Sequence, residues 1–134
     1  MREIKFKAWL KKEYFSVLNP ENKVYDVENL DFDTQQAYLS ECGWCDFKDI
    51  ELMQYTGLKD KNGAEIYEGY IVEYYGKNAV VTIGFPHDEK WYPYGICVEY
   101  IKYNLKEVEY VYKLNLEDLE VIGNIYENPE LLTA

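Results

Sequence analysis

The chain has 134 residues, with 25 acidic against 14 basic side chains and a net charge of −11. This length predicts that residues 1–134 fold as a single domain with a core of their own. An acidic surface repels a phosphate backbone, so direct binding to nucleic acid is not expected. Aromatic residues make up 17% of the chain and include 15 tyrosines, a residue that favours half-buried strand positions.

The sequence favours the cytoplasm over a membrane or a secreted location. No apolar stretch reaches the roughly 20 residues of a membrane helix. The N-terminal residues pass directly into an alternating pattern without the apolar core of a signal peptide. The three cysteines are an odd number, which argues against a disulfide framework and agrees with a reducing compartment.

The first elements along the chain are predicted to be strands. Apolar and polar residues alternate over 4–9, and a second strand is expected over 13–18, ending at Pro20. The following segment, 19–48, has no clear period. We expect it to be irregular and loop-rich, with a weakly patterned short helix over 30–39 as its only regular element.

The rest of the chain reads as short strands separated by turns. Strands are predicted over 49–55, 70–75, 79–85, 94–101, 108–114 and 120–126, with a single helical turn over 116–119. Asn62-Gly63 predicts a tight hairpin, because both residue types tolerate positive φ. Short strands with frequent turns are typical of a mainly β fold, an antiparallel barrel or a sandwich.

Three stretches, over 1–9, 55–69 and 121–132, resemble the YopX-like family of phage and prophage proteins in their residues and in their order along the chain. The central stretch is Tyr-Thr-Gly-Leu-Lys-Asp-Lys-Asn-Gly-Ala-Glu-Ile-Tyr-Glu-Gly. The resemblance implies a small antiparallel SH3-like β-barrel, a phage or prophage origin and self-association. It implies no known activity.

One position departs from the family pattern. The family usually reads Glu-Gly-Asp-Ile-Val after the central stretch, and Tyr70 stands here where that Asp would be. An Asp beside a glycine turn typically accepts hydrogen bonds from nearby backbone amides. The departure therefore favours a role in turn geometry for that position in relatives, and it removes one acidic candidate from this chain.

Cys42 and Cys45 form a Cys-x-x-Cys pair, which is typical of a redox dithiol or of half a zinc site. A redox dithiol is expected to precede a helix, and none is predicted after Cys45. A zinc site needs two further ligands, for which His87 and Cys97 are available. Structural thiols are the simpler interpretation, and we expect no cofactor, with zinc at these four residues as the alternative.

No catalytic set is predicted. His87 is the only histidine and lies in a polar loop, and the chain has no Gly-x-Ser-x-Gly motif and no glycine-rich phosphate loop. The acidic pairs Asp88-Glu89 and Glu117-Asp118 are interpreted as solvated surface. We therefore expect no enzymatic activity.

The remaining candidates concern binding. Trp91, Tyr92 and Tyr94 lie in a predicted loop that either binds a partner or caps one end of a barrel. The expected function is a non-enzymatic module that binds a protein or itself. The alternatives are an acidic mimic of DNA and a metal-dependent hydrolase. The segments around Cys42–Cys45 and Trp91–Tyr94 are the expected location of any functional site.

Overall fold

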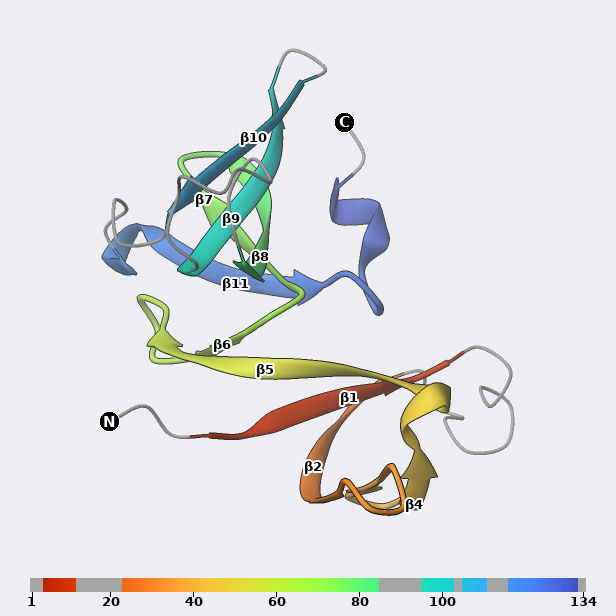
Figure 1. Ribbon diagram of the computed structural model, residues 1–134. Coiled ribbons are helices and arrows are strands. Elements are labelled where there is room, and N and C mark those ends of the chain that lie inside the picture. Colours follow the sequence, from red (N-terminus) through yellow and green to blue (C-terminus); the bar gives the residue numbers. More distant parts are fainter. Residues whose placement is uncertain (1–3, 12–22, 85–94, 103–104, 111–115, 133–134) are drawn as a thin grey trace. The chain divides into compact units, whose positions relative to one another are not determined.

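The computed structural model describes residues 4–11, 23–84, 95–102, 105–110 and 116–132 (Figure 1). The strand predicted over 13–18 and the predicted loop over 86–93 lie outside these residues. The described part is mainly β, as predicted, and contains only short 3-10 helices. None of these helices is long and apolar enough to cross a membrane.

The strands are β1 Phe6–Leu10, β2 Val24–Asp31, β3 Gln36–Leu39, β4 Gly43–Asp46, β5 Ile50–Lys59, β6 Glu65–Tyr67, β7 Tyr70–Tyr74, β8 Lys77–Gly84, β9 Gly95–Lys102, β10 Leu105–Tyr110 and β11 Leu119–Asn124. The 3-10 helices are η2 Phe47–Asp49, η5 Leu116–Asp118 and η6 Pro129–Leu132. The strands predicted over 4–9 and from residue 49 onwards all overlap with observed strands, and the helical turn predicted over 116–119 is η5.

The strands form two antiparallel sheets, in the orders β4-β3-β2-β1-β5-β6 and β10-β9-β8-β7-β11. Contacts divide the chain into two compact units, residues 3–54 and, essentially, residues 55–134. The boundary falls within β5, whose first half pairs with β1 and whose second half pairs with β6. The strand pairings among the described residues close no barrel, so the SH3-like barrel stays a prediction.

Each unit has its own apolar core, built from the alternate residues along its strands that point inward. In the first unit the buried residues are Ala8, Leu10, Tyr25, Ala37, Leu39, Cys45 and Ile50. In the second they are Ile66, Val72, Ala79, Val81, Val98 and Leu119.

The segment 19–48 is more regular than predicted. Within it β2, β3 and β4 form a meander, and the expected helix over 30–39 is wrong because that stretch is strand, turn and strand. The register of β2 against β3 shifts between Val27 and Asn29, which breaks the period of two that a regular strand would show. The strands themselves are short and rich in polar residues, which hid their alternation in the sequence.

The glycine-rich block over 55–69 forms the β5–β6 hairpin, whose loop is organised by Asp60. Asp60 is only 7% exposed, and its Oδ1 accepts hydrogen bonds from the amides of Asn62 and Ala64, both at 2.9 Å. Gly63 has a φ of +83°, as the hairpin prediction requires, but Asn62 is not in the positive-φ region. The loop therefore closes around the Asp60 carboxylate and is not a two-residue Asn-Gly turn.

Asp60 also fastens this hairpin to β11. Its Oδ2 accepts a hydrogen bond from the Val121 amide at 2.8 Å, and the Lys61 amide donates to the Leu119 carbonyl at 3.0 Å. Burial would raise the pKa of Asp60, but the amides of Val121, Ala64 and Asn62 outweigh burial and leave this pKa below its ordinary value. The carboxylate thus holds two family-like stretches of the sequence together.

A second polar network closes the end of β11. Asn124 is buried, and its Oδ1 accepts hydrogen bonds from the amides of Tyr126 and Glu127 at 3.0 and 2.8 Å. The Asn128 Oδ1 in turn accepts from the Asn124 amide at 3.3 Å. A Cβ on Gly123 would lie 2.5 Å from that Asn128 oxygen, so any larger residue here would have to displace the Asn128 side chain. The stretch 121–132 is therefore explained as scaffold.

Candidate functional site

The meander of β2, β3 and β4 presents one face of polar and aromatic side chains. Across the three strands Asn29 lies opposite Tyr38, and Tyr38 lies opposite Trp44. The neighbouring row consists of Asp31, Gln36 and Asp46. The residues between them along each strand, such as Ala37 and Cys45, point into the core. We call the six side chains of these two rows the aromatic–acidic face.

Tyr38 and Trp44 form an aromatic pair on this face. Their ring centroids are 5.4 Å apart and the rings meet edge to face at 79°. Tyr38 is 37% exposed and Trp44 is 49% exposed. Tyr and Trp held on a rigid sheet lose little conformational entropy on binding, which is why they are enriched at protein interfaces.

The turn from β2 to β3 is held by its own polar groups. The Asp31 Oδ1 accepts hydrogen bonds from the amides of Asp33 and Thr34 at 3.0 and 3.3 Å. This turn displays Phe32, whose side chain is 74% exposed and contacts the Phe47 ring edge to face, with 5.9 Å between centroids. An exposed aromatic ring thus extends the surface beyond the sheet.

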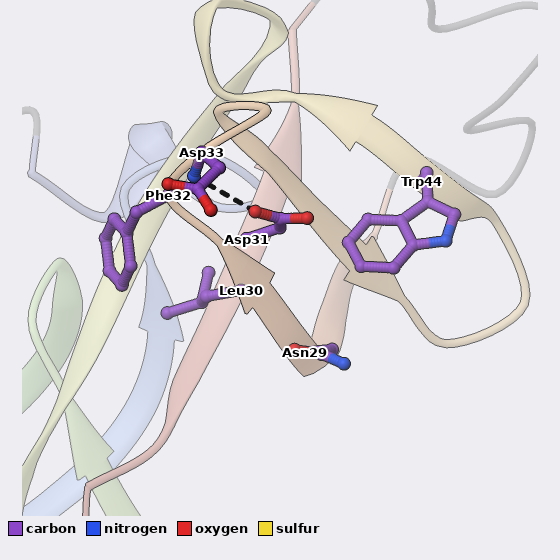
Figure 2. Close-up of a pocket in the computed structure, with 6 residues that line it drawn as sticks. All are labelled: Asn29, Leu30, Asp31, Phe32, Asp33 and Trp44. Atoms are coloured by element: carbon purple, nitrogen blue, oxygen red, sulfur yellow. Dashed lines mark hydrogen bonds between the residues drawn. The ribbon is translucent and has the colours of Figure 1, made fainter.

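An open depression of about 470 Å³ lies beside the aromatic–acidic face, and its lining residues are Asn29, Leu30, Asp31, Phe32, Asp33 and Trp44. In the view of Figure 2 Asp31 lies between Phe32 and Trp44. The Asp31 Oδ1 is used by the turn, whereas its Oδ2 has no hydrogen-bond partner among the described residues. The depression therefore combines aromatic walls with an available carboxylate oxygen.

Acidic residues are concentrated in this part of the chain. Residues 24–49 contain seven acidic side chains and one lysine. Asp26 and Glu41 form ion pairs with Lys7 and Lys23, with N–O distances of 2.7 and 2.9 Å. Among the described residues, the acidic side chains of the depression have no such ion pair. Within the part of the chain that the structure describes, the depression is therefore a negatively charged surface without a neighbouring cation.

The four predicted zinc ligands lie in different parts of the chain, and only three of them are among the described residues. Cys45 is buried in the core of the first unit and its Sγ contacts the Gly43 carbonyl at 3.8 Å, while Cys42 is half-buried. Cys97 lies on β9 in the other unit, and His87 is outside the described residues. Nowhere in the described ranges do three or more His, Cys, Asp or Glu side chains gather as metal ligands would. The four-residue zinc site stays a prediction.

The thiols of Cys42 and Cys45 are not set up as nucleophiles. Burial raises the pKa of both thiols, and the neighbouring Glu41 raises that of Cys42 further. A raised pKa disfavours the thiolate, which is the reactive form. Their surroundings agree with the structural interpretation.

The other candidates from the sequence fall in different places. Trp91, Tyr92 and Tyr94 lie outside the described residues. Asp118 is on η5, where its Oδ2 accepts a hydrogen bond from the Tyr75 hydroxyl at 2.7 Å. Asp118, one member of the Glu117-Asp118 pair, therefore has a hydrogen-bonding role within the fold.

The sequence did not single out Tyr38 and Trp44 as site residues. The available signal was the alternation Gln36-Ala37-Tyr38-Leu39, with small or apolar residues inside and larger polar or aromatic ones outside. Trp44 lies between Cys42 and Cys45, whose Cys-x-x-Cys spacing is the stronger sequence signal. The sequence therefore indicates this segment, but through its thiols and not through its aromatic residues.

Comparison with known proteins identifies the family. Residues 5–133 match the family described as YopX protein. No curated protein matches the chain. The crystal structure of protein EF1440 from Enterococcus faecalis is similar over 99% of this chain and 100% of that chain, with 23% identity and a TM-score of 0.51. At that identity the likeness shows the fold alone. Because the family match spans nearly all of the sequence, the chain belongs to the YopX family.

Proposed function

We propose that this chain is a non-enzymatic protein-binding module that uses the aromatic–acidic face and the adjoining depression. One observation carries the proposal: Tyr38 and Trp44 stand exposed and in contact with each other on a sheet. Solvent-exposed Tyr and Trp side chains on a fixed backbone are the usual anchors of an interface. An accessory role for a phage or prophage, in the cytoplasm of a bacterium, is part of the same proposal and follows the resemblance noted in the sequence.

A hydrolase is less well supported by the geometry. Asp31 and Asp33 both line the depression, and two carboxylates in a cleft are a common feature of such an enzyme. However, Asp31 is engaged by the amides of its own turn, and the side chain of Asp33 is exposed to water. Acid–base catalysis favours carboxylates whose surroundings shift their pKa, and this open turn offers no such enclosure.

A mimic of DNA is also less well supported. Double-stranded DNA carries about one charge per 1.7 Å of its axis, and a mimic needs many carboxylates at comparable spacing. The aromatic–acidic face carries Asp31 and Asp46, separated by Gln36 and flanked by aromatic rings. A surface that mixes aromatic and acidic side chains suits a protein segment better than it imitates the evenly spaced phosphates of DNA.

The test is a selection of random peptides displayed on a carrier, followed by calorimetry with the selected peptides. We expect peptides that bind the wild-type chain and lose at least about tenfold in affinity with Trp44→Thr, because interface tryptophans typically contribute 2 kcal/mol or more. Threonine preserves the strand preference of β4. Tyr75→Asn, which removes a tyrosine 70% exposed in the other unit, is the matched control and should leave binding unchanged.

Two outcomes would refute the proposal. One is that no peptide is selected over background. The other is that selected peptides bind Trp44→Thr as well as they bind the wild type. Sedimentation of the chain alone, with and without Trp44→Thr, distinguishes binding of a foreign segment from self-association through the same face.

A further inference from the structure

We infer that the occupant of the depression is an arginine side chain of an extended partner segment, with its guanidinium against Trp44 and its N–H groups directed to Asp31 and Asp33. This inference rests on the proposed function and deepens it by naming the chemistry of the partner. It commits to one occupant, a cationic protein segment, because the surface is acidic and its acidic groups form no ion pair with the described residues.

The first step concerns charge. Where an acidic side chain of this unit has a lysine within reach, the two form an ion pair, as Asp26 does with Lys7. Asp31 and Asp33 have no cation of the chain beside them among the described residues. The Asp31 Oδ2 and the Asp33 carboxylate are therefore available acceptors for an incoming donor, and the repulsion between these neighbouring charges is relieved when a cation binds.

The second step concerns shape. The two carboxylates lie in a depression that also has Trp44 and Phe32 in its lining. Figure 2 shows the Trp44 indole and the Phe32 ring on either side of Asp31 in that view. A planar cation can therefore meet an aromatic ring and a carboxylate within the same depression. Cation–π attraction is strongest for tryptophan and is stronger when the pair is removed from water.

The third step separates arginine from lysine. A guanidinium is planar, stacks on aromatic rings and offers several N–H donors in a fixed fork that can reach two carboxylates together. A lysine ammonium is more strongly hydrated and acts as a point charge, so it loses more hydration when it enters an aromatic depression. The combination of an indole with two carboxylates selects the guanidinium.

The test uses two small probes, N-acetyl-arginine amide and N-acetyl-citrulline amide, which have nearly the same shape but differ in charge. Binding is followed by the nuclear magnetic resonance signal of the Trp44 indole N–H, assigned with Trp44→Thr. We expect the arginine probe to shift this signal at a concentration at least about tenfold below that needed for citrulline. N-acetyl-lysine amide should bind more weakly than the arginine probe.

A variant with both Asp31→Asn and Asp33→Asn should reduce the preference for arginine over citrulline to about twofold or less. The indole signal of Trp9, which lies on β1 and does not line the depression, should not move and serves as an internal control. Asn retains the acceptor that the turn uses, so the turn should be kept. The same carboxamide substitution at Glu73, an exposed residue of β7 in the other unit, should leave the preference for arginine unchanged.

Equal shifts by the arginine and citrulline probes overturn the inference, as does an arginine preference that survives the double Asn variant. A Trp44 signal that changes with protein concentration alone also overturns it, because a second copy of the chain would then be the occupant. If displayed peptides depend on Trp44 but replacing their arginines by citrulline has no effect, this inference fails while the proposed function stands.

Discussion

Polar side chains have different environments in the two units of this chain. In the second unit Asp60, Asn124 and Thr56 are buried and form hydrogen bonds with backbone groups. The Thr56 hydroxyl, for example, donates to the Ile66 carbonyl at 2.7 Å. In the first unit Asp31 and Asp33 lie at an open depression beside exposed aromatic rings. Polar groups that are satisfied by the chain itself hold the fold, whereas those left to solvent beside aromatics are the candidates for binding.

The comparison also separates family signature from function. The stretches over 55–69 and 121–132 meet at Asp60 and Val121, and both are accounted for by hydrogen bonds of the fold. The proposed binding surface lies in 29–46, which none of the family-like stretches covers.

The largest effect is expected at Asp60. Asp60→Ala removes a buried carboxylate and leaves the amides of Asn62, Ala64 and Val121 without their acceptor. We expect a loss of about 3 kcal/mol in the free energy of unfolding, measured by urea denaturation. Asp33→Ala, which removes an exposed carboxylate, should change this free energy by less than about 0.5 kcal/mol. Equal effects of the two substitutions would break the comparison.

Part of the Asp60 contribution should depend on pH. Because the pKa of Asp60 lies below its ordinary value in the folded chain, its stabilisation is complete above the pKa of the unfolded state. It is lost as the pH falls through the folded-state pKa. The difference in unfolding free energy between the wild type and Asp60→Asn should therefore shrink on acidification. A difference that grew in acid would contradict the assigned direction.

A smaller loss is expected at Gly123. Gly123→Ala places a methyl group against the Asn128 side chain, which must move and release the Asn124 amide. The expected cost is about 1–2 kcal/mol in unfolding free energy. Because both changes break one contact, adding Gly123→Ala to Asn128→Ala should cost much less than it does alone. Full additivity of the two substitutions would show that the contact is not the cause.

The smallest effect on stability is expected on the aromatic–acidic face. Tyr38→Thr and Trp44→Thr remove half-exposed rings from strands without opening a cavity in the core. The free energy of unfolding should fall by no more than about 1 kcal/mol, the contribution expected of a cross-strand aromatic pair. A large destabilisation by either would place these rings in the scaffold and weaken the case for a binding surface.

The sequence predicted most of the second unit because its strands are rich in β-branched and aromatic residues and several are separated by glycine turns. Tyr70–Tyr74 and Lys77–Gly84 are examples. It did not predict the role of Asp60, although an Asp two residues before Asn62 is a typical start of an Asx turn. The bond to Val121 joins positions 61 residues apart, which local pattern cannot reveal.

The first unit was harder to predict for a related reason. Strands of four residues such as Gln36–Leu39 and Gly43–Asp46 are too short for a clear period, and the bulge in β2 shifts the pattern midway. The aromatic–acidic face exists only when three such strands are in register. Tyr38 and Trp44 become neighbours through that pairing. The sequence could therefore indicate the segment of the candidate site but not the residues that form it.

The most direct test of the division between scaffold and binding surface is peptide binding by Asp60→Ala and Trp44→Thr, measured by calorimetry at a temperature where both remain folded. We predict that Asp60→Ala binds a selected peptide with the affinity of the wild type despite its lower stability. Trp44→Thr should lose at least about tenfold in affinity at nearly unchanged stability. Loss of binding in Asp60→Ala together with full binding in Trp44→Thr would contradict the division.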